Sequence, residues 1–173
     1  MRYRWFESIS LQQRVCLLAD GGHIPSAPRF GGIPRYGGGV WMPHYTALMA
    51  EAHEIAGQLE EGLALLDEAL QIAERTGERW LEAELYRHKG QLLLRQGHSE
   101  AAEELYRRAL SIAVEQGAKL WELRAAASLA RLRRDEGRPA EARDLLAPIY
   151  GWFTEGFATP DLKEAKALLD ALA

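Results

Sequence analysis

The chain has 173 residues, of which 47% are apolar and 27% charged, and its formal net charge is −4. These values predict one medium-sized globular domain and exclude wholesale disorder. The negative charge argues against non-specific nucleic-acid binding, and no run approaches the roughly 18 apolar residues of a membrane span. A single cysteine, Cys16, excludes a disulfide framework. We therefore expect a soluble, cytoplasmic protein.

Residues 1–39 are rich in glycine and proline. Between Gly21 and Gly39 the sequence reads GGHIPSAPRFGGIPRYGGG, which neither a helix nor a central strand tolerates. The segment lacks the preceding strand and the lysine of a phosphate-binding loop. We expect an irregular or disordered leader here, with at most a short amphipathic helix at 8–20. Residues 40–173 are instead dominated by the strong helix formers Ala, Leu, Glu and Arg, and predict a helical domain.

The helical part repeats at an interval of forty residues. A shift by forty superposes Gly57, Gly97 and Gly137, and places the pattern Leu-x3-Ala-Leu-x-Ile-Ala of 65–73 on that of 105–113. Apolar residues recur every three or four positions, as in amphipathic helices, and stacked hairpins would share their apolar faces. The sequence predicts helices near 43–56, 59–76, 79–96, 99–116, 119–136 and 139–154, paired as three hairpins, and a terminal helix near 160–172.

Several residues mark the expected helix ends. Gly97 stands where a helix needs a left-handed terminal residue, and Ser99 is predicted to cap the next helix. Pro139 fits a first helical turn, whereas Pro148 lies inside a helix and predicts a kink or break there. Thr159 is the expected cap of the terminal helix. That helix should turn Leu162, Ala165, Leu168, Leu169 and Leu172 inward and Lys163, Glu164, Lys166 and Asp170 outward, as a solubilising cap.

Small and aromatic residues predict how the helices pack. Where the two helices of each hairpin cross, Ala50, Gly90 and Ala130 are expected to face Gly62, Ala102 and Ala142 respectively. Trp41, Trp80 and Trp121 recur at the start of each first helix, where a large side chain can pack on the neighbouring hairpin. A second aromatic group comprises Tyr150, Trp152, Phe153 and Phe157. It fits either packing under the terminal helix or an adhesive partner surface.

The second hairpin resembles the tetratricopeptide repeat (TPR) family. Tyr86, Gly90, Leu93, Gly97, Ala102, Tyr106 and Ala109 stand at that motif's aromatic, Gly, Tyr, Gly, Ala, aromatic and Ala positions. Lys89 departs from the usual leucine, and the forty-residue period exceeds the family's usual length of about 34 residues. The resemblance implies an all-α, right-handed TPR-like solenoid of three hairpins plus a C-terminal capping helix.

A narrower resemblance covers roughly residues 38–173. The stretches GERWLEAELYRHKGQLLLRQG and DLKEAKALLDALA are similar to the C-terminal repeats of large bacterial signalling proteins. In those proteins an adenylate/guanylate cyclase domain is followed by a predicted ATPase module and a TPR array. No cyclase or ATPase motif is present here. The resemblance implies an interaction tail, or a fragment of such a protein, without the enzyme.

The TPR resemblance also implies a concave groove lined by the first helices. Its residues would be His44, Ala47, Glu51 and Glu54, then Glu84, Arg87, Gln91 and Arg95, then Arg124, Ala127, Arg131 and Arg134. This surface would run from acidic to basic. Because arginine matches carboxylates, an acidic protein or peptide segment is the expected guest. Plain solvated helix faces without a ligand remain the alternative.

The remaining side chains predict no catalytic centre. The histidines lack the spacing of a helical metal pair, and no basic cluster surrounds Cys16. No catalytic residue, cofactor or metal is therefore expected, and neither nucleic acid nor membrane is an expected partner. We interpret the chain as a non-catalytic protein–protein interaction module. A self-association module that forms homo-oligomers is the alternative, and an enzyme with an unrecognised site is less well supported.

Overall fold

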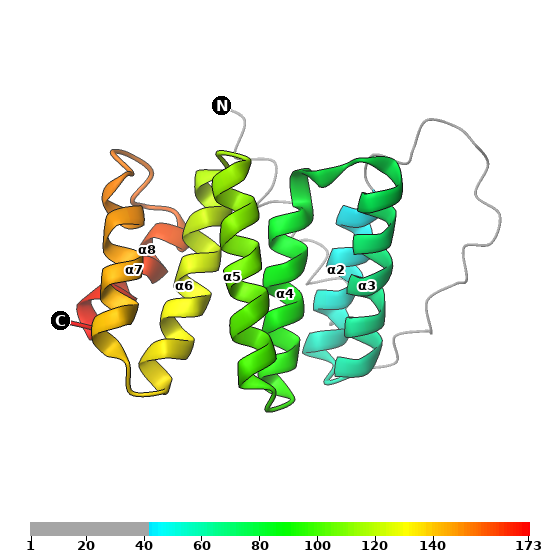
Figure 1. Ribbon diagram of the computed structural model, residues 1–173, viewed down its shortest axis with the longest axis horizontal. Coiled ribbons are helices and arrows are strands. Elements are labelled where there is room, and N and C mark those ends of the chain that lie inside the picture. The colour runs from blue at the N-terminus through cyan, green and yellow to red at the C-terminus, as the bar shows by residue number, and fades with distance from the viewer. Residues whose placement is uncertain (1–41) are drawn as a thin grey trace.

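The computed structural model describes residues 42–173, and every regular element within that range is helical (Figure 1). The elements are α2 (Met42–Ile55), α3 (Leu59–Thr76), the short 3-10 helix η2 (Arg79–Leu81), α4 (Glu82–Arg95), α5 (Ser99–Glu115), α6 (Lys119–Asp135), α7 (Pro139–Gly151) and α8 (Pro160–Ala171). All seven predicted helices are present. The predicted leader, residues 1–39, and Trp41 lie outside the described residues.

The helices end where the local sequence signals place them, with one exception. Gly97 has a φ of 88°, the left-handed conformation that glycine adopts without a steric cost. Beside it, the backbone N–H of His98 donates to the carbonyl of Leu93 at 2.9 Å. The prediction that Ser99 caps α5 is wrong. Ser99 is already the first helical residue, and His98 precedes it without a side-chain capping bond.

Proline has different consequences at the two ends of α7. Pro139 occupies the first turn, as predicted. Of the kink or break expected at Pro148, the break is wrong, because α7 continues through this residue to Gly151, and the kink stays a prediction. Pro148 is exposed, so its ring lies at the surface and the helix loses one backbone hydrogen bond without disturbing the core.

The two helices of the first hairpin, and those of the second, cross at small residues. A Cβ atom added to Gly90 would lie 3.2 Å from the carbonyl oxygen of Ala102 and 2.8 Å from the Tyr106 ring. A Cβ atom on Gly62 would lie 3.3 Å from the carbonyl oxygen of Ala50. The predicted small-residue pairs are therefore confirmed at these crossings, where two backbones approach closely.

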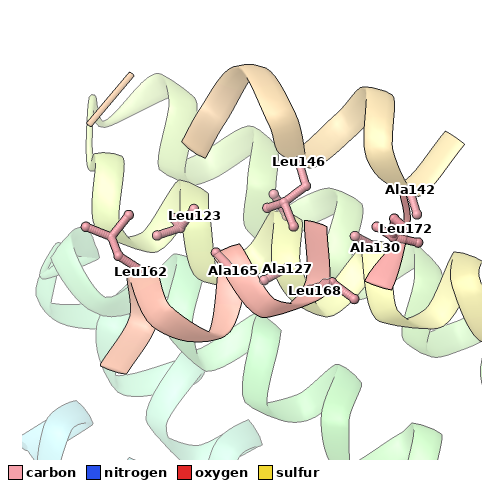
Figure 2. Packing of buried hydrophobic residues seen from close by; sticks show 10 residues of the cluster. Leu123, Ala127, Ala130, Ala142, Leu146, Leu162, Ala165, Leu168 and Leu172 are labelled. Atoms are coloured by element: carbon pink, nitrogen blue, oxygen red, sulfur yellow. The ribbon is translucent and has the colours of Figure 1, made fainter. Parts of the chain in front are cut away.

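The terminal helix α8 stacks on the third hairpin. It contacts both α6 and α7, as α6 contacts both α4 and α5. Figure 2 shows that its apolar side chains point into a cluster with residues of α6 and α7. On α8 the buried members are Leu162, Ala165 and Leu168, and Leu172 follows directly after the helix. The helix thus takes the place that the first helix of a fourth hairpin would occupy.

Candidate functional site

A cavity of about 510 Å³ is lined by the first helix of each hairpin, namely α2, α4 and α6, and by α8. Its lining residues are Glu51, Glu54 and Ile55 of α2; Glu84, Arg87, His88, Gln91 and Arg95 of α4; Leu123, Arg124, Ala127, Ser128 and Arg131 of α6; and Asp161 and Glu164 of α8. Charged and polar side chains dominate this lining. The cavity therefore follows the inner helices of the stack from the first hairpin to α8.

Most of the predicted groove residues line this cavity. The structure brings together Glu51, Glu54, Glu84, Arg87, Gln91, Arg95, Arg124 and Arg131, together with Ala127. His44 and Ala47 are not among the lining residues. Neither is Arg134, which corrects the prediction for that residue. It lies exposed in the last turn of α6, and its guanidinium binds the Asp135 carboxylate at 2.8 Å.

Glu84 is the most buried charged group of the cavity, with 6% of its surface exposed. Arg87 donates to both of its carboxylate oxygens, at 2.8 and 2.9 Å. Nε2 of His88 lies 3.3 Å from the carboxylate, and Arg124 reaches it from α6 at 3.4 Å. Burial alone would raise the pKa of Glu84, but Arg87 and His88 outweigh burial and hold the pKa well below its ordinary value.

Glu54 connects α2 to α4. Its carboxylate accepts hydrogen bonds from the side-chain amide of Gln91 at 2.8 Å and from Arg95 at 3.1 Å. The oxygen of the same Gln91 amide accepts a hydrogen bond from Arg87 at 3.1 Å. Because Arg87 also binds Glu84, a continuous chain of polar contacts runs from the first hairpin to the second.

Two acidic residues of α8 bind arginines of α6. The Asp161 carboxylate accepts hydrogen bonds from Nε and Nη2 of Arg124, at 2.5 and 3.0 Å. One turn later, Glu164 accepts a hydrogen bond from Nη2 of Arg131 at 3.0 Å. The expected change from acidic to basic along the groove is therefore wrong, because α8 adds carboxylates at the end that was expected to be basic.

Sequence reasoning missed the contribution of α8 to the cavity. It placed Glu164 on the outward face of a capping helix, and it did not include Asp161 among the groove residues. The forty-residue shift did indicate that Glu164 belongs to the groove, because it superposes Glu164 on the predicted groove residues Glu84 and Arg124. Asp161 lies three residues before Glu164 and hence on the same helical face.

The arginines of the cavity differ in how many partners each guanidinium binds and in how exposed it is. Arg87 and Arg124 each bind at least two partners, and their side chains are 14% and 33% exposed. The side chains of Arg95 and Arg131 are 49% and 40% exposed. Each of these two donates hydrogen bonds through a single terminal nitrogen. They are therefore the lining arginines most accessible to a guest.

The aromatic residues divide between packing and exposure. Trp80 and Trp121 are partly buried and pack against the core shared by the first two hairpins, as predicted. Tyr150 and Phe153 pack against the core beneath α8. Trp152 and Phe157 instead remain 58% and 47% exposed. The second aromatic group thus contributes two side chains to the core and leaves two exposed.

Within residues 42–173, no group of three or more His, Cys, Asp or Glu side chains is placed to hold a metal ion. Over the same residues, no helix combines the length and the apolar character needed to cross a membrane.

Comparison with known proteins agrees with this architecture. Residues 44–115, from the first turn of α2 to the end of α5, match the family described as Tetratricopeptide repeat. The TPR resemblance is thus confirmed for this segment. No match to the chain was found among curated proteins.

Solved structures extend the likeness beyond that segment. The nearly identical TPR-like repeats of a Podosopora anserina protein assigned as a kinesin light chain superpose with a TM-score of 0.57 and 19% identity, covering 94% of this chain and 74% of theirs. A substituted form of those repeats gives a TM-score of 0.58 and 19% identity, and covers 75% of this chain but only 64% of its own length. At such identity the likeness concerns the fold alone. The fold is a TPR-like helical solenoid, as the sequence predicted.

Proposed function

We propose that this protein is a non-catalytic interaction module whose cavity binds a segment of a partner protein. TPR repeats generally mediate protein–protein interaction, and repeat solenoids present extended concave surfaces for it. The observation that supports this role best is the cavity itself, in which four successive inner helices each present charged side chains to the same space.

An acidic segment is the guest that the cavity fits best. Arg95 of α4 and Arg131 of α6 line the same cavity, are about half exposed, and retain donors beyond those that bind Glu54 and Glu164. A guanidinium presents a planar set of N–H groups that matches a carboxylate. Two such groups on neighbouring helices give an extended acidic segment two points of attachment.

The test is the binding of a fluorescein-labelled hexaglutamate peptide, measured by fluorescence anisotropy. Exchange of both exposed arginines, Arg95→Glu and Arg131→Glu, should weaken binding at least tenfold, about 1.4 kcal/mol. Affinity for the unchanged protein should also fall with added salt, because exposed charges are screened.

A matched control uses Arg75→Glu and Arg143→Glu. Both residues are exposed on second helices, α3 and α7, outside the cavity lining, and the net charge changes equally. The control should bind the peptide within about twofold of the unchanged protein. An equal loss in both double variants would show that binding follows net charge rather than the cavity.

We further propose that the module acts in the cytoplasm as part of a bacterial signalling protein. The support is the similarity of roughly residues 38–173 to the C-terminal repeats of cyclase-containing signalling proteins. In that setting the acidic guest would belong to the same signalling assembly.

Self-association is a second candidate, and the two exposed aromatic side chains of Trp152 and Phe157 favour it. Light scattering across a range of protein concentrations tests this function. A mass that rises with concentration, and that returns to the monomer value in the Trp152→Ser variant, would support self-association. A constant monomer mass would exclude it.

A further inference from the structure

The two carboxylates that α8 places in the cavity lie where guest carboxylates would bind. We propose that Asp161 and Glu164 determine the specificity of this groove by competing with a guest for Arg124 and Arg131. The inference rests on the proposed function, since it concerns which segments the cavity accepts. It gives α8 a role in recognition besides its role in covering the third hairpin.

The occupancy of Arg124 shows the competition most clearly. Its Nε and Nη2 atoms donate to the two oxygens of Asp161, and its Nη1 atom donates to Glu84 at 3.4 Å. The guanidinium also lies 5.1 Å from the centre of the Trp121 ring. A guest carboxylate can therefore reach the forked side of Arg124 only by displacing Asp161.

The packing of α8 keeps both competitors in place. Leu162, Ala165, Leu168 and Leu172 are all at most 8% exposed and anchor the helix in the core of the third hairpin. Asp161 and Glu164 stand on the first two turns of this anchored helix. They remain beside the cavity when a guest arrives, so each guest must outcompete carboxylates held at high local concentration.

The two residues also change the balance of charge in the cavity. The lining holds five carboxylates, from Glu51, Glu54, Glu84, Asp161 and Glu164, and four guanidiniums, from Arg87, Arg95, Arg124 and Arg131. Without the two carboxylates of α8, three carboxylates would face four guanidiniums. The residues of α8 thus convert a lining with an excess of cations into one with an excess of anions, which disfavours uniformly acidic guests.

A guest of mixed charge avoids this penalty. When its carboxylate takes Arg131, the exposed Glu164 side chain gives up its ion pair, and it regains one only where the guest supplies a cation. A guest that carries a lysine next to its acidic residue supplies that cation. The groove should therefore prefer acidic segments with interspersed basic residues over segments that are acidic throughout.

The experiment compares two labelled probes, hexaglutamate and an alternating Glu-Lys hexapeptide, by fluorescence anisotropy. The double change Asp161→Asn and Glu164→Gln should tighten hexaglutamate binding about tenfold, and Glu164→Gln alone about threefold. Binding of the alternating peptide should change less than about twofold. The double change frees arginines for the peptide's glutamates but removes carboxylates from its lysines, so the two effects oppose each other. The preference between the probes therefore shifts toward hexaglutamate.

The control is the double change Glu104→Gln and Asp144→Asn, which removes one Glu and one Asp from exposed positions on α5 and α7. It should leave both affinities unchanged, which separates the local effect from that of net charge. Thermal melting checks that α8 stays folded. Glu164→Gln alone keeps the test decisive if the double variant melts early, because the Glu164 side chain is 67% exposed.

The outcomes distinguish this inference from the function on which it rests. Tighter hexaglutamate binding by the α8 variants supports the inference, even where the unchanged protein binds too weakly to measure. Measurable binding that is equal in the unchanged protein and both α8 variants overturns it and leaves the interaction role intact. Absence of binding to either probe by every form overturns both.

Discussion

Glu84 combines deep burial with cationic neighbours from two helices, Arg87 on α4 and Arg124 on α6. Its pKa is depressed in the folded protein, whereas it is about 4.3 in an unfolded chain. A depressed pKa means that this carboxylate contributes stability above about pH 4.3, and that the contribution is lost as the pH falls toward the folded value. Stability of the protein should therefore decline on acidification below that pH.

Replacing this carboxylate should expose its contribution directly. Glu84→Gln should lower the free energy of unfolding by about 3 kcal/mol at pH 7, because it leaves the buried Arg87 without its counter-ion. The difference from the unchanged protein should shrink as the pH falls below about 4. Urea titrations at pH 7 and at a pH below about 4 measure this difference in the free energy of unfolding. The control Glu82→Gln breaks an ion pair with the exposed Arg79 and should change stability far less, because solvent screens an exposed pair. Equal effects of the two changes would contradict the prediction.

Ala102 lies at the crossing of α4 and α5, fully buried against Gly90 and beneath Tyr106. Ala102→Leu should overpack this crossing and lower the free energy of unfolding by roughly 1–3 kcal/mol. The neighbouring Ala101 is exposed on the same helix, so Ala101→Leu should change stability by less than about 0.5 kcal/mol. Denaturant midpoints measure both variants. An unchanged midpoint for Ala102→Leu would show that the crossing has room for a larger side chain.

At the scale of elements, α7 offers an internal comparison between its two prolines. Pro148 lies past the first turn of the helix and has no N–H to donate to the carbonyl of Asp144. The missing N–H of Pro139, in the first turn, costs nothing. Pro148→Ala should therefore raise the free energy of unfolding by about 1–3 kcal/mol. Pro139→Ala should leave it unchanged or lower it slightly. Thermal melting tests the pair, and a loss of stability in Pro148→Ala would mean that the ring supplies contacts worth more than the hydrogen bond.

At the scale of the whole molecule, the features predicted from the sequence are those set by local periodicity. Helix spans and the crossing at Gly90 follow from apolar spacing and from residues small enough for close approach, and both recur every forty positions. The partners of the charged residues do not follow from spacing. Arg131 binds Glu164 and Arg134 binds its neighbour Asp135 because of how α8 stacks and how the last turn of α6 is oriented. Sequence alone could place arginines on a face but could not say which carboxylates were already bound to them.

The stacking of α8 also bears on how such an array can grow. Successive inner helices begin at Arg79 with η2, at Lys119 and at Pro160, so the spacing stays near forty residues up to the last helix. Since α8 contacts both α6 and α7, as α6 contacts both α4 and α5, a duplicated unit of this length, inserted ahead of α8, would have helices to contact on both sides. In a gene, duplication in blocks of about forty codons would then lengthen the groove while the terminal helix kept its place. The same geometry offers protein engineers a junction at which binding surface can be added one hairpin at a time.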